Sequence, residues 1–359
     1  MIRSDRTRME TILLPTNAPA LFEDAVARAA AVLLAGDPVA LPTETVYGLA
    51  ADALRPEAVV KIFEAKERPF FDPLIVHLPD RAWLEKLADI PAESRALVDT
   101  LIARFWPGPL TLVLPRREVV PDVVTAGLGT VAVRMSAHPV FRAVIERYGR
   151  PLAAPSANRF GRISPTTGAH VHAELAGRIP LILDGGASQH GVESTIVAVE
   201  GGTLRMLRAG PVTAHDLAEV WMETHPAPDG MTQDEMRGFF STLTPAAGAR
   251  PEAPGQLASH YAPGTRLFLI DNATELTPGS GVRAGLLGWK RAPGHDYGRF
   301  AQVEWLSEKG ELREAAAGLF AKLRRLDEAG LDVILAERLP DAGLGAAIMD
   351  RLRKAAHPK

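Results

Sequence analysis

Two cationic side chains beside a proline are the first residues in this sequence that could do chemistry. Lys66 and Arg68 are separated by one residue, and Pro69 follows them in the stretch AKERPFFDPLIVH (65–77). Cations at the C-terminus of a helix favour the helix dipole, which is the commoner reason for such a pair. A rigid arginine fork and a mobile lysine charge also make a clamp for phosphate oxygens. The pair alone leaves both interpretations open.

Two loops carry dense sets of small hydrogen-bonding groups. The stretch PSANRFGRISPTT (155–167) combines hydroxyl and amide donors with a glycine that allows close backbone approach: Ser156, Asn158, Gly161, Ser164, Thr166 and Thr167. The stretch DGGASQHGVEST (184–195), which includes Ser194, has the same character. Such mixtures form anion-binding loops and are as common in solvated surface loops. Neither stretch has the spacing of a P-loop.

Polar groups between apolar runs are the next candidates. His77 ends a short apolar run, where a single histidine is more often a satisfied core group. In PTETVYG, Thr43, Glu44 and Thr45 either satisfy local backbone groups or line a pocket for a small zwitterion.

Two arginines complete the set of candidates. Arg134 and Arg208 lie near the ends of predicted strands, where open sheets bind their ligands. A strand arginine is usually paired with a carboxylate. Together with Lys66 and Arg68, however, these two could neutralise a triphosphate whose burial would otherwise be very costly.

The composition limits the kinds of function. The chain has 359 residues, enough for two domains, and its 47% hydrophobic and 23% charged residues are typical of a soluble globular protein. A net charge of −3 argues against a polyanion gripped along the whole chain, so phosphate chemistry is expected in a local pocket. The absence of cysteine excludes disulfides, thiolate metal sites and a cysteine nucleophile. Without a signal peptide or membrane span, a cytoplasmic enzyme or binding protein is expected.

Strands alternating with helices must position these residues. Helices are predicted at residues 19–35, 56–66, 92–106 and 138–149. Strands are predicted within residues 38–50, 73–78, 110–115, 130–135, 151–154, 179–186, 194–200 and 203–210. The alternation predicts an α/β or mixed α+β domain over residues 14–224.

The texture of the chain changes after residue 224. Residues 225–263 are rich in Pro, Ala and Gly, as in a semi-rigid linker, and enclose one predicted helix, MTQDEMRGFFSTL (231–243). A second alternation follows, with strands in residues 265–270, 282–289 and 331–337 and helices over 313–330 and 343–356. It predicts a small open α/β domain over residues 264–357.

Nine motifs, taken in order, resemble the two-domain form of the threonylcarbamoyl-AMP synthase family. The core motifs are LPTETVYGL, KIFEAKERPFFDPLIVH, TVAVRMSAHP, PLAAPSANRFG, SPT, GVESTIV and LRAGPV, and the linker and tail motifs are APGQLASHYAP and AGLGAAIMDRLRKAA. The resemblance implies a YrdC-type twisted mixed sheet with a deep cavity, a Pro/Gly-rich linker laid over its mouth, and a small Rossmann-like α/β C-terminal domain.

The resemblance also implies a reaction. L-threonine, bicarbonate or CO2, and ATP would give threonylcarbamoyl-adenylate and pyrophosphate, the first step of threonylcarbamoyladenosine modification of tRNA beside the anticodon. Mg2+ would arrive with ATP, and downstream proteins would transfer the threonylcarbamoyl group; direct contact with tRNA stays open. Such nucleotidyl transfer needs positioning, charge neutralisation and exclusion of water more than a protein nucleophile.

Site residues follow from the resemblance at the positions that match its motifs. The implied catalytic cations are Lys66 and Arg68. The implied ATP contacts are Arg68, Asp72, Thr130, Ser156, Asn158, Ser164, Arg208 and Tyr261, and the implied threonine contacts are Thr45, His77, Arg134, Ala154 and Ser194. No metal ligand is expected from the protein. Asp72 stands where the family more often has Asn or His, and a carboxylate there repels phosphate unless it accepts a ribose hydroxyl or helps to hold Mg2+.

Three alternatives stay open from the sequence. A double-stranded RNA or tRNA-binding module of the same fold would act without turnover, although the net charge and the lack of aromatic-rich basic stretches count against it. A carbamoyl-adenylate enzyme of hydrogenase maturation would normally carry zinc-finger-like modules, which a chain without cysteine cannot form. A regulatory ligand sensor of the same fold is excluded only by turnover.

Overall fold

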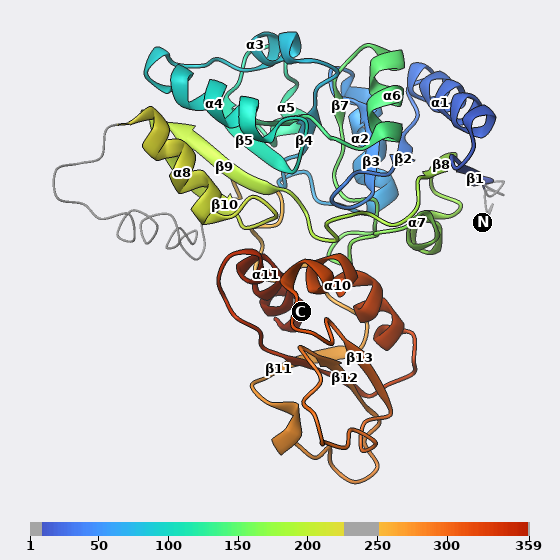
Figure 1. Cartoon of the computed structure of the whole chain (residues 1–359). Helices are drawn as coiled ribbons and strands as arrows, with labels where there is room; N and C mark the ends of the chain where they lie inside the picture. Colours follow the sequence, from blue (N-terminus) through green and yellow to red (C-terminus); the bar gives the residue numbers. More distant parts are fainter. Residues whose placement is uncertain (1–8, 226–250, 358–359) are drawn as a thin grey trace.

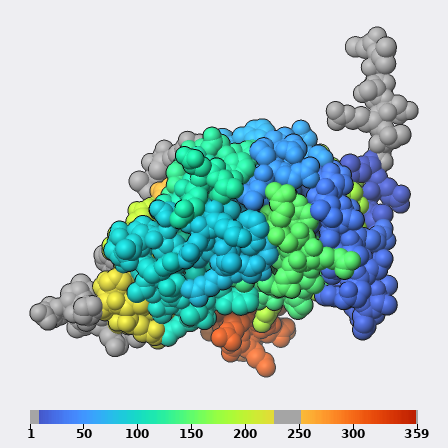
Figure 2. Space-filling model, turned by 90° about the horizontal axis from the view of Figure 1, so that it is seen from above, coloured from blue at the N-terminus to red at the C-terminus, as the bar shows by residue number. Residues whose placement is uncertain are grey.

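The computed structural model describes residues 9–225 and 251–357, which form a larger domain stacked on a smaller one (Figure 1). Seen from above, the larger domain hides most of the smaller one, of which an orange part shows at one edge (Figure 2). The helix expected at residues 231–243 lies outside the described residues. The boundaries 14–224, 225–263 and 264–357 therefore stay predictions. No helix in the described ranges is long and apolar enough to cross a membrane.

A mixed sheet of ten strands is the frame of the larger domain. Its strands are β1 (Ile12–Pro15), β2 (Val39–Leu41), β3 (Gly48–Asp52), β4 (Ile75–His77), β5 (Leu110–Pro115), β6 (Thr130–Arg134), β7 (Leu152–Ala153), β8 (Leu181–Asp184), β9 (Thr195–Glu200) and β10 (Thr203–Arg208). Their order is β1-β8-β2-β3-β7-β4-β6-β5-β9-β10, with parallel and antiparallel pairs interspersed. The predicted mixed α/β class is confirmed.

Eight α-helices are described in this domain. They are α1 (Pro19–Leu34), α2 (Pro56–Lys66), α3 (Leu84–Leu87), α4 (Arg95–Phe105), α5 (Asp122–Thr125), α6 (Pro139–Tyr148), α7 (Gly168–Leu175) and α8 (Ala214–Thr224), with short 3-10 turns at Arg81–Trp83 and Ala92–Ser94. Pro56 occupies the first turn of α2, where its missing N–H needs no partner. The helix ends at Lys66 because Glu67 turns into the left-handed region (φ 55). The chain therefore leaves α2 at the cation pair.

The two faces of the large sheet are covered differently. Helices α2, α4 and α8 pack on one face in a single core cluster. On the other face, α1 and α6 cover the β2, β3 and β8 side in a second cluster. Beside them the face carries short side chains such as Ile75 and Ala132. His77 and Arg134 are ladder partners at the carboxyl ends of parallel β4 and β6, so both lie on this less covered face.

The smaller domain contains a parallel sheet of four strands. The strands are β11 (Arg266–Ile270), β12 (Ala284–Gly288), β13 (Gln302–Trp305) and β14 (Val333–Glu337), in the order β11-β14-β12-β13. A 3-10 turn covers Ala273–Glu275, and the helices are α10 (Leu312–Asp327) and α11 (Leu344–Ala356). Both helices lie between this sheet and the larger domain (Figure 1). The smaller domain therefore meets the larger one through its helices.

Residues 251–263, called the strap below, join the two domains. Ala262 donates its N–H to the Gly161 carbonyl (2.9 Å) and forms a bridge with Arg162. Arg208, at the end of β10, donates to the Pro254 carbonyl (3.2 Å). The strap is thus fastened to the larger domain at both of its ends.

Candidate functional site

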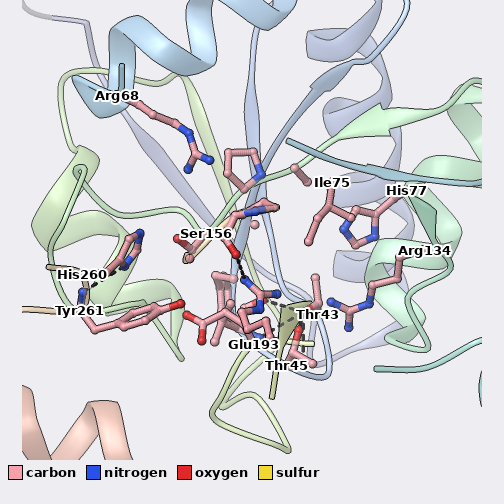
Figure 3. Close-up of a pocket in the computed structure, with 18 residues that line it drawn as sticks. Thr43, Thr45, Arg68, Ile75, His77, Arg134, Ser156, Glu193, His260 and Tyr261 are labelled. Atoms are coloured by element: carbon pink, nitrogen blue, oxygen red, sulfur yellow. Dashed lines mark hydrogen bonds between the residues drawn. The ribbon is translucent and has the colours of Figure 1, made fainter. Parts of the chain in front are cut away.

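A cavity opens on the less covered face of the large sheet, with the strap along one side. Its empty volume, with the open solvent at the mouth included, is about 520 Å³. Eight of the predicted site residues line it: Thr45, Arg68, His77, Arg134, Ala154, Ser156, Arg208 and Tyr261. Figure 3 shows Arg68, His260 and Tyr261 toward one end, and His77 and Arg134 toward the other.

Six predicted residues lie outside the cavity lining: Lys66, Asp72, Thr130, Asn158, Ser164 and Ser194. Five of them touch or flank a lining residue from behind, as described below. Thr130 is the exception. It begins β6, four residues before Arg134 on the same face of the sheet, and is partly exposed.

Lys66 lies behind the wall that Ser156 forms. Its ammonium is buried and donates hydrogen bonds to the carbonyls of Ser156 and Asn158, the latter at 2.6 Å. Burial, together with the nearby Arg68 charge, lowers the pKa of Lys66 well below its ordinary value. No carboxylate forms an ion pair with Lys66 in the part of the chain that the structure describes. The charges of Asp72 and Glu174 act on the ammonium without direct contact.

Arg68 is neutralised from behind by Asp72. Its guanidinium lies 2.9 Å from the Asp72 carboxylate and donates to the carbonyl of Pro73 at 2.9 Å. Asp72 is fully buried, and burial raises its pKa. The departure from the family pattern thus places the carboxylate beside Arg68 and not in the cavity wall. A direct nucleotide contact of Asp72 stays a prediction.

Arg208 projects from the end of β10 without a carboxylate partner. Its guanidinium donates to the backbone carbonyl and the hydroxyl of Ser194, both at 3.0 Å. Ser194 in turn shares a hydrogen bond with Thr111 (2.8 Å). Among the described residues, no acidic side chain pairs with Arg208. Ser194 therefore orients this arginine, which keeps its charge available to a ligand.

At the other end, Arg134 forms a buried ion pair with Glu44. The closest atoms, Nη2 and Oε1, are 2.7 Å apart, and Ser136 donates to the second carboxylate oxygen at 2.5 Å. Burial alone would raise the pKa of Glu44, but the Arg134 charge and the Ser136 hydroxyl lower it to about 2. The sequence pointed to Glu44 as a candidate but not to Arg134 as its partner. This end of the cavity is charge-balanced.

His77 is neutral at this balanced end. Burial and the Arg134 charge lower its pKa to about 3. Its ring lies 4.5 Å from that of Phe141 in α6, and its Nδ1 has no hydrogen-bond partner among the described residues. The hydroxyls of Thr43 and Thr45 share a hydrogen bond of 2.8 Å on the adjacent wall. These small polar groups fit a small polar ligand.

The strap contributes two aromatic rings. Tyr261 adopts a left-handed backbone (φ 60), and its buried hydroxyl has no hydrogen-bond partner within the described ranges. The Tyr261 N–H donates to Nδ1 of His260 at 3.0 Å, so the neutral imidazole carries its proton on Nε2. Burial lowers the pKa of His260 well below its ordinary value. His260 lines the cavity but was not singled out from the sequence, although the motif SHYAP contained it.

Glu193 is a second lining residue that the sequence analysis missed. It accepts a hydrogen bond from Ser164 (2.5 Å) and pairs with Arg351 of α11 (3.0 Å). Ser164 therefore supports Glu193 from outside the lining. A carboxylate inside the apolar-rich motif GVESTIV was the signal that could have identified it.

The loop that carries Ser156 is stiffened by Asn158. Its side-chain amide donates to the carbonyls of Arg159 and Arg162, both at 2.8 Å, while its own oxygen accepts nothing among the described residues. No group of three or more metal-ligating side chains occurs in residues 9–225 and 251–357. The arrangement can bind one polyanionic and one zwitterionic group side by side.

Comparison with known proteins covers almost the whole chain. A family model described as "Telomere recombination" matches residues 31–210, and one described as "Threonylcarbamoyl-AMP synthase, C-terminal domain" matches residues 212–357. Proteins named threonylcarbamoyl-AMP synthase from Pyrococcus abyssi and Bacillus subtilis are each 41% identical; the alignments cover 91% and 92% of this chain and 92% of each relative. The crystal structure of P. abyssi Sua5 complexed with L-threonine is 39% identical, with a TM-score of 0.79 over 96% of this chain and 97% of that one.

Proposed function

The chain belongs to the threonylcarbamoyl-AMP synthase family, and we propose that it is the nucleotidyltransferase that makes threonylcarbamoyl-adenylate. Its substrates are L-threonine, bicarbonate or CO2, and ATP, and its second product is pyrophosphate. The product supplies the threonylcarbamoyl group for modification of tRNA beside the anticodon, through separate transfer proteins.

One observation carries this proposal, namely the unequal distribution of charge along the cavity. Lys66 and Arg208 have no carboxylate partners among the described residues, and both are buried against one end. At the other end Arg134 and Glu44 balance each other at 2.7 Å. Burial disfavours an unpaired charge, and a polyanion at the first end would supply the missing partners. The second end suits a ligand with one positive and one negative group.

We assign the ATP phosphates to the end with excess positive charge, called the ATP end below. Arg68 and Arg208 offer forked donors to phosphate oxygens, and Lys66 supplies a third cation behind Ser156. The protonated Nε2 of His260 and the free hydroxyl of Tyr261 add neutral donors along the strap. Mg2+ enters as part of the Mg–ATP substrate, because phosphate oxygens and water satisfy most of its ligand positions.

We assign L-threonine to the balanced end, called the threonine end below. The Arg134 guanidinium is the donor for the threonine carboxylate, and Thr45, His77 and Ala154 line the space around it. The P. abyssi relative whose structure contains L-threonine supports L-threonine as a ligand, and the assignment to this end rests on the charges and the lining. A neutral His77 adds no charge to the balance.

The chemistry needs position more than a protein nucleophile. The amine of threonine forms an N–C bond with CO2, or with bicarbonate as water leaves, and loses a proton, which gives the carbamate of N-carboxy-threonine. A carbamate oxygen then attacks the α-phosphorus of ATP and forms a new P–O bond. The bond from that phosphorus to the bridging oxygen breaks, and pyrophosphate leaves with the electron pair. Arg68, Arg208 and Lys66 offset the negative charge of the phosphates during this step. The strap narrows the access of water, which would decompose the carbamate.

Burial of the cations counts against the RNA-binding alternative. Lys66, Arg68 and Arg208 are each at most 6% exposed, so a duplex backbone cannot reach them. Binding to a nucleic acid requires basic groups on an accessible face.

Pyrophosphate release by the purified chain tests the proposed function. With Mg–ATP, release should require both L-threonine and bicarbonate, and L-serine should replace threonine poorly. Release without either co-substrate would indicate a plain ATPase. A folded protein that releases none would contradict the synthase assignment and return weight to the RNA-binding and sensor alternatives.

A further inference from the structure

The last described helix, α11, reaches the ATP end of the cavity from the other domain. Its Arg351 is 1% exposed, and the Arg351 Nε–H donates a hydrogen bond to a carboxylate oxygen of Glu193 at 3.0 Å. Its Nη1 donates to the carbonyl of Ala209 at 2.7 Å, directly after Arg208. One side chain of the smaller domain thus contacts both the Glu193 carboxylate and the backbone next to Arg208 at the ATP end of the cavity.

The pair with Arg351 changes what Glu193 does to a phosphate. Glu193 lines the cavity, where an unpaired carboxylate would repel an incoming triphosphate. Burial alone would raise its pKa, but the charges of Arg351 and Arg208 hold the pKa below its ordinary value, so the group is ionised. Only a fixed cation behind it makes this wall compatible with ATP. Arg351 is the cation in direct contact.

Arg351 also supports the strap. Its guanidinium lies 5.4 Å from the centre of the Tyr261 ring, whose other neighbours include Phe320 of α10 at 5.7 Å. One turn further along α11, Lys354 donates to the Gly255 carbonyl at 2.7 Å. A side chain at Gly255 would meet the Tyr261 hydroxyl at 2.6 Å, so the strap and this ring are closely packed. Helix α11 therefore determines where the Tyr261 hydroxyl points.

We propose that Arg351 is a positioning residue for the ATP end: it neutralises Glu193 and fixes Tyr261, so the smaller domain completes the nucleotide site. This inference rests on the proposed function and adds a role for the C-terminal domain. Arg351 does not line the cavity, and its effect passes through the two lining residues that it touches.

Replacement of Arg351 by methionine tests the proposal. In Arg351→Met the side chain keeps much of its length but leaves Glu193 unpaired beside the phosphates. We expect KM for ATP and the directly measured Kd for Mg–ATP to rise about 10- to 100-fold. KM for L-threonine should change less than about 3-fold, because Arg134 and Glu44 lie at the other end. An equal rise of both constants would overturn the proposal.

Arg324 offers a matched control in the same domain interface. It is a buried arginine of α10 that pairs with Glu174 (3.2 Å) and donates to the Ile163 carbonyl, but neither it nor Glu174 lines the cavity. Arg324→Met should lower the thermal midpoint and leave ATP binding within about 2-fold. If it weakens ATP as much as Arg351→Met does, the effect belongs to domain docking and the proposal is wrong.

A double variant separates charge from packing. Adding Glu193→Gln to Arg351→Met removes the unpaired carboxylate that would repel the phosphates. Most of the lost ATP affinity should therefore return, to within about 5-fold of wild type. A purely structural role of Arg351 predicts no such rescue. Arg351→Lys keeps the charge without the fork and serves if the methionine variant does not fold; it should give a smaller rise in Kd.

Direct binding of Mg–ATP also distinguishes this inference from the proposed function. A wild-type chain that binds ATP but releases no pyrophosphate would contradict the synthase assignment, and the variants would still test Arg351 through Kd. Unchanged Kd in Arg351→Met would overturn the positioning role even if the wild type is an active synthase. A wild type that binds no ATP would overturn both.

Discussion

The two ends of the cavity solve the problem of buried charge in opposite ways. At the threonine end, Arg134 and Glu44 pair at 2.7 Å and His77 stays neutral. The ATP end holds more cations than carboxylates: Lys66, Arg68, Arg208 and Arg351 against Asp72, Glu193 and Asp350, of which the last two both pair with Arg351. Among the described residues, the balanced end is complete in the protein alone, whereas the other has two cations without an ionic partner.

This difference shows which end has its charges balanced within the protein and which end needs a ligand to balance them. A protein that buries a charge normally supplies its counter-charge, as Glu44 does for Arg134. Where the counter-charge is missing, the free energy is recovered only on binding. The excess at the ATP end therefore fits the polyanion that we propose there, and the balance at the threonine end fits a ligand of no net charge.

The largest effect is expected from breaking the balanced end. Arg134→Met leaves Glu44 as a buried, unpaired carboxylate and should lower the free energy of unfolding by about 3–5 kcal/mol. Denaturant unfolding measures it. The double variant Arg134→Met/Glu44→Gln should recover most of the stability without recovering threonine binding. If Arg134→Met were as stable as the wild type, Arg134 would not be the counter-charge that stabilises the buried Glu44 carboxylate.

The matching change at the ATP end should spare stability and cost function. Arg208→Met leaves no carboxylate unpaired, so the free energy of unfolding should fall by only about 1 kcal/mol. The free energy of ATP binding should weaken by about 2–3 kcal/mol, because the charge-assisted contacts to phosphate are lost. Equilibrium binding of Mg–ATP and of L-threonine measures whether the loss of affinity is confined to ATP. Equal weakening of both ligands would erase the distinction between the ends.

Acid should act on the threonine end through His77. Its pKa is about 3 in the folded chain and 6.5 ordinarily, so below pH 6.5 the unfolded chain binds the additional proton. Stability therefore falls as the pH drops below 6.5, and between pH 7 and pH 5 His77 should account for about 2 kcal/mol of the loss. His77→Gln should remove that part, and the exposed His295→Gln should not. Identical pH profiles for wild type and His77→Gln would contradict a neutral buried histidine.

Salt should produce the smallest difference. Raising the ionic strength from about 0.05 M to about 0.5 M screens long-range attraction of the ATP end for phosphate, so KM for ATP should rise a few-fold. KM for threonine should stay nearly constant, because a balanced end attracts a neutral zwitterion only at contact. Steady-state kinetics at saturating co-substrate measure both, and parallel salt slopes would argue against the charge difference.

Much of the fold followed from local patterns. Glycine and proline marked the ends of α1, α2 and α6, and apolar runs marked the central strands, since these signals need no distant contact. β13 was missed because its residues Gln302–Trp305 are all half-buried and form no apolar run. β1 (Ile12–Pro15) was also missed, although it is an apolar run like the predicted strands, and only its pairing with β8 identifies it. The order of the ten strands depends on tertiary packing, which no single-sequence pattern reports.

The site was predicted in its cations and less well in its carboxylates. Arginines beside predicted strand ends stood out, and Arg134 and Arg208 do line the cavity. Glu44 and Glu193 act through partners 90 and 158 residues away, so their roles depend on contacts that the sequence does not reveal. Lys66 and Ser194 do not line the cavity and instead contact residues of its wall from the protein side. The sequence does not show on which side of the wall a side chain lies, because that depends on the turn next to each element.

Helix α11 also gives the site an order of assembly during translation. The ribosome makes the residues of the threonine end together with Lys66 and Arg68, then Arg208 and the strap, and reaches Arg351 only after the second sheet has been made. Until then Glu193 has no cation behind it and Tyr261 has no helix to lie against. A nascent or prematurely terminated chain can thus form the threonine end while the ATP end still lacks the helix that positions Glu193 and Tyr261.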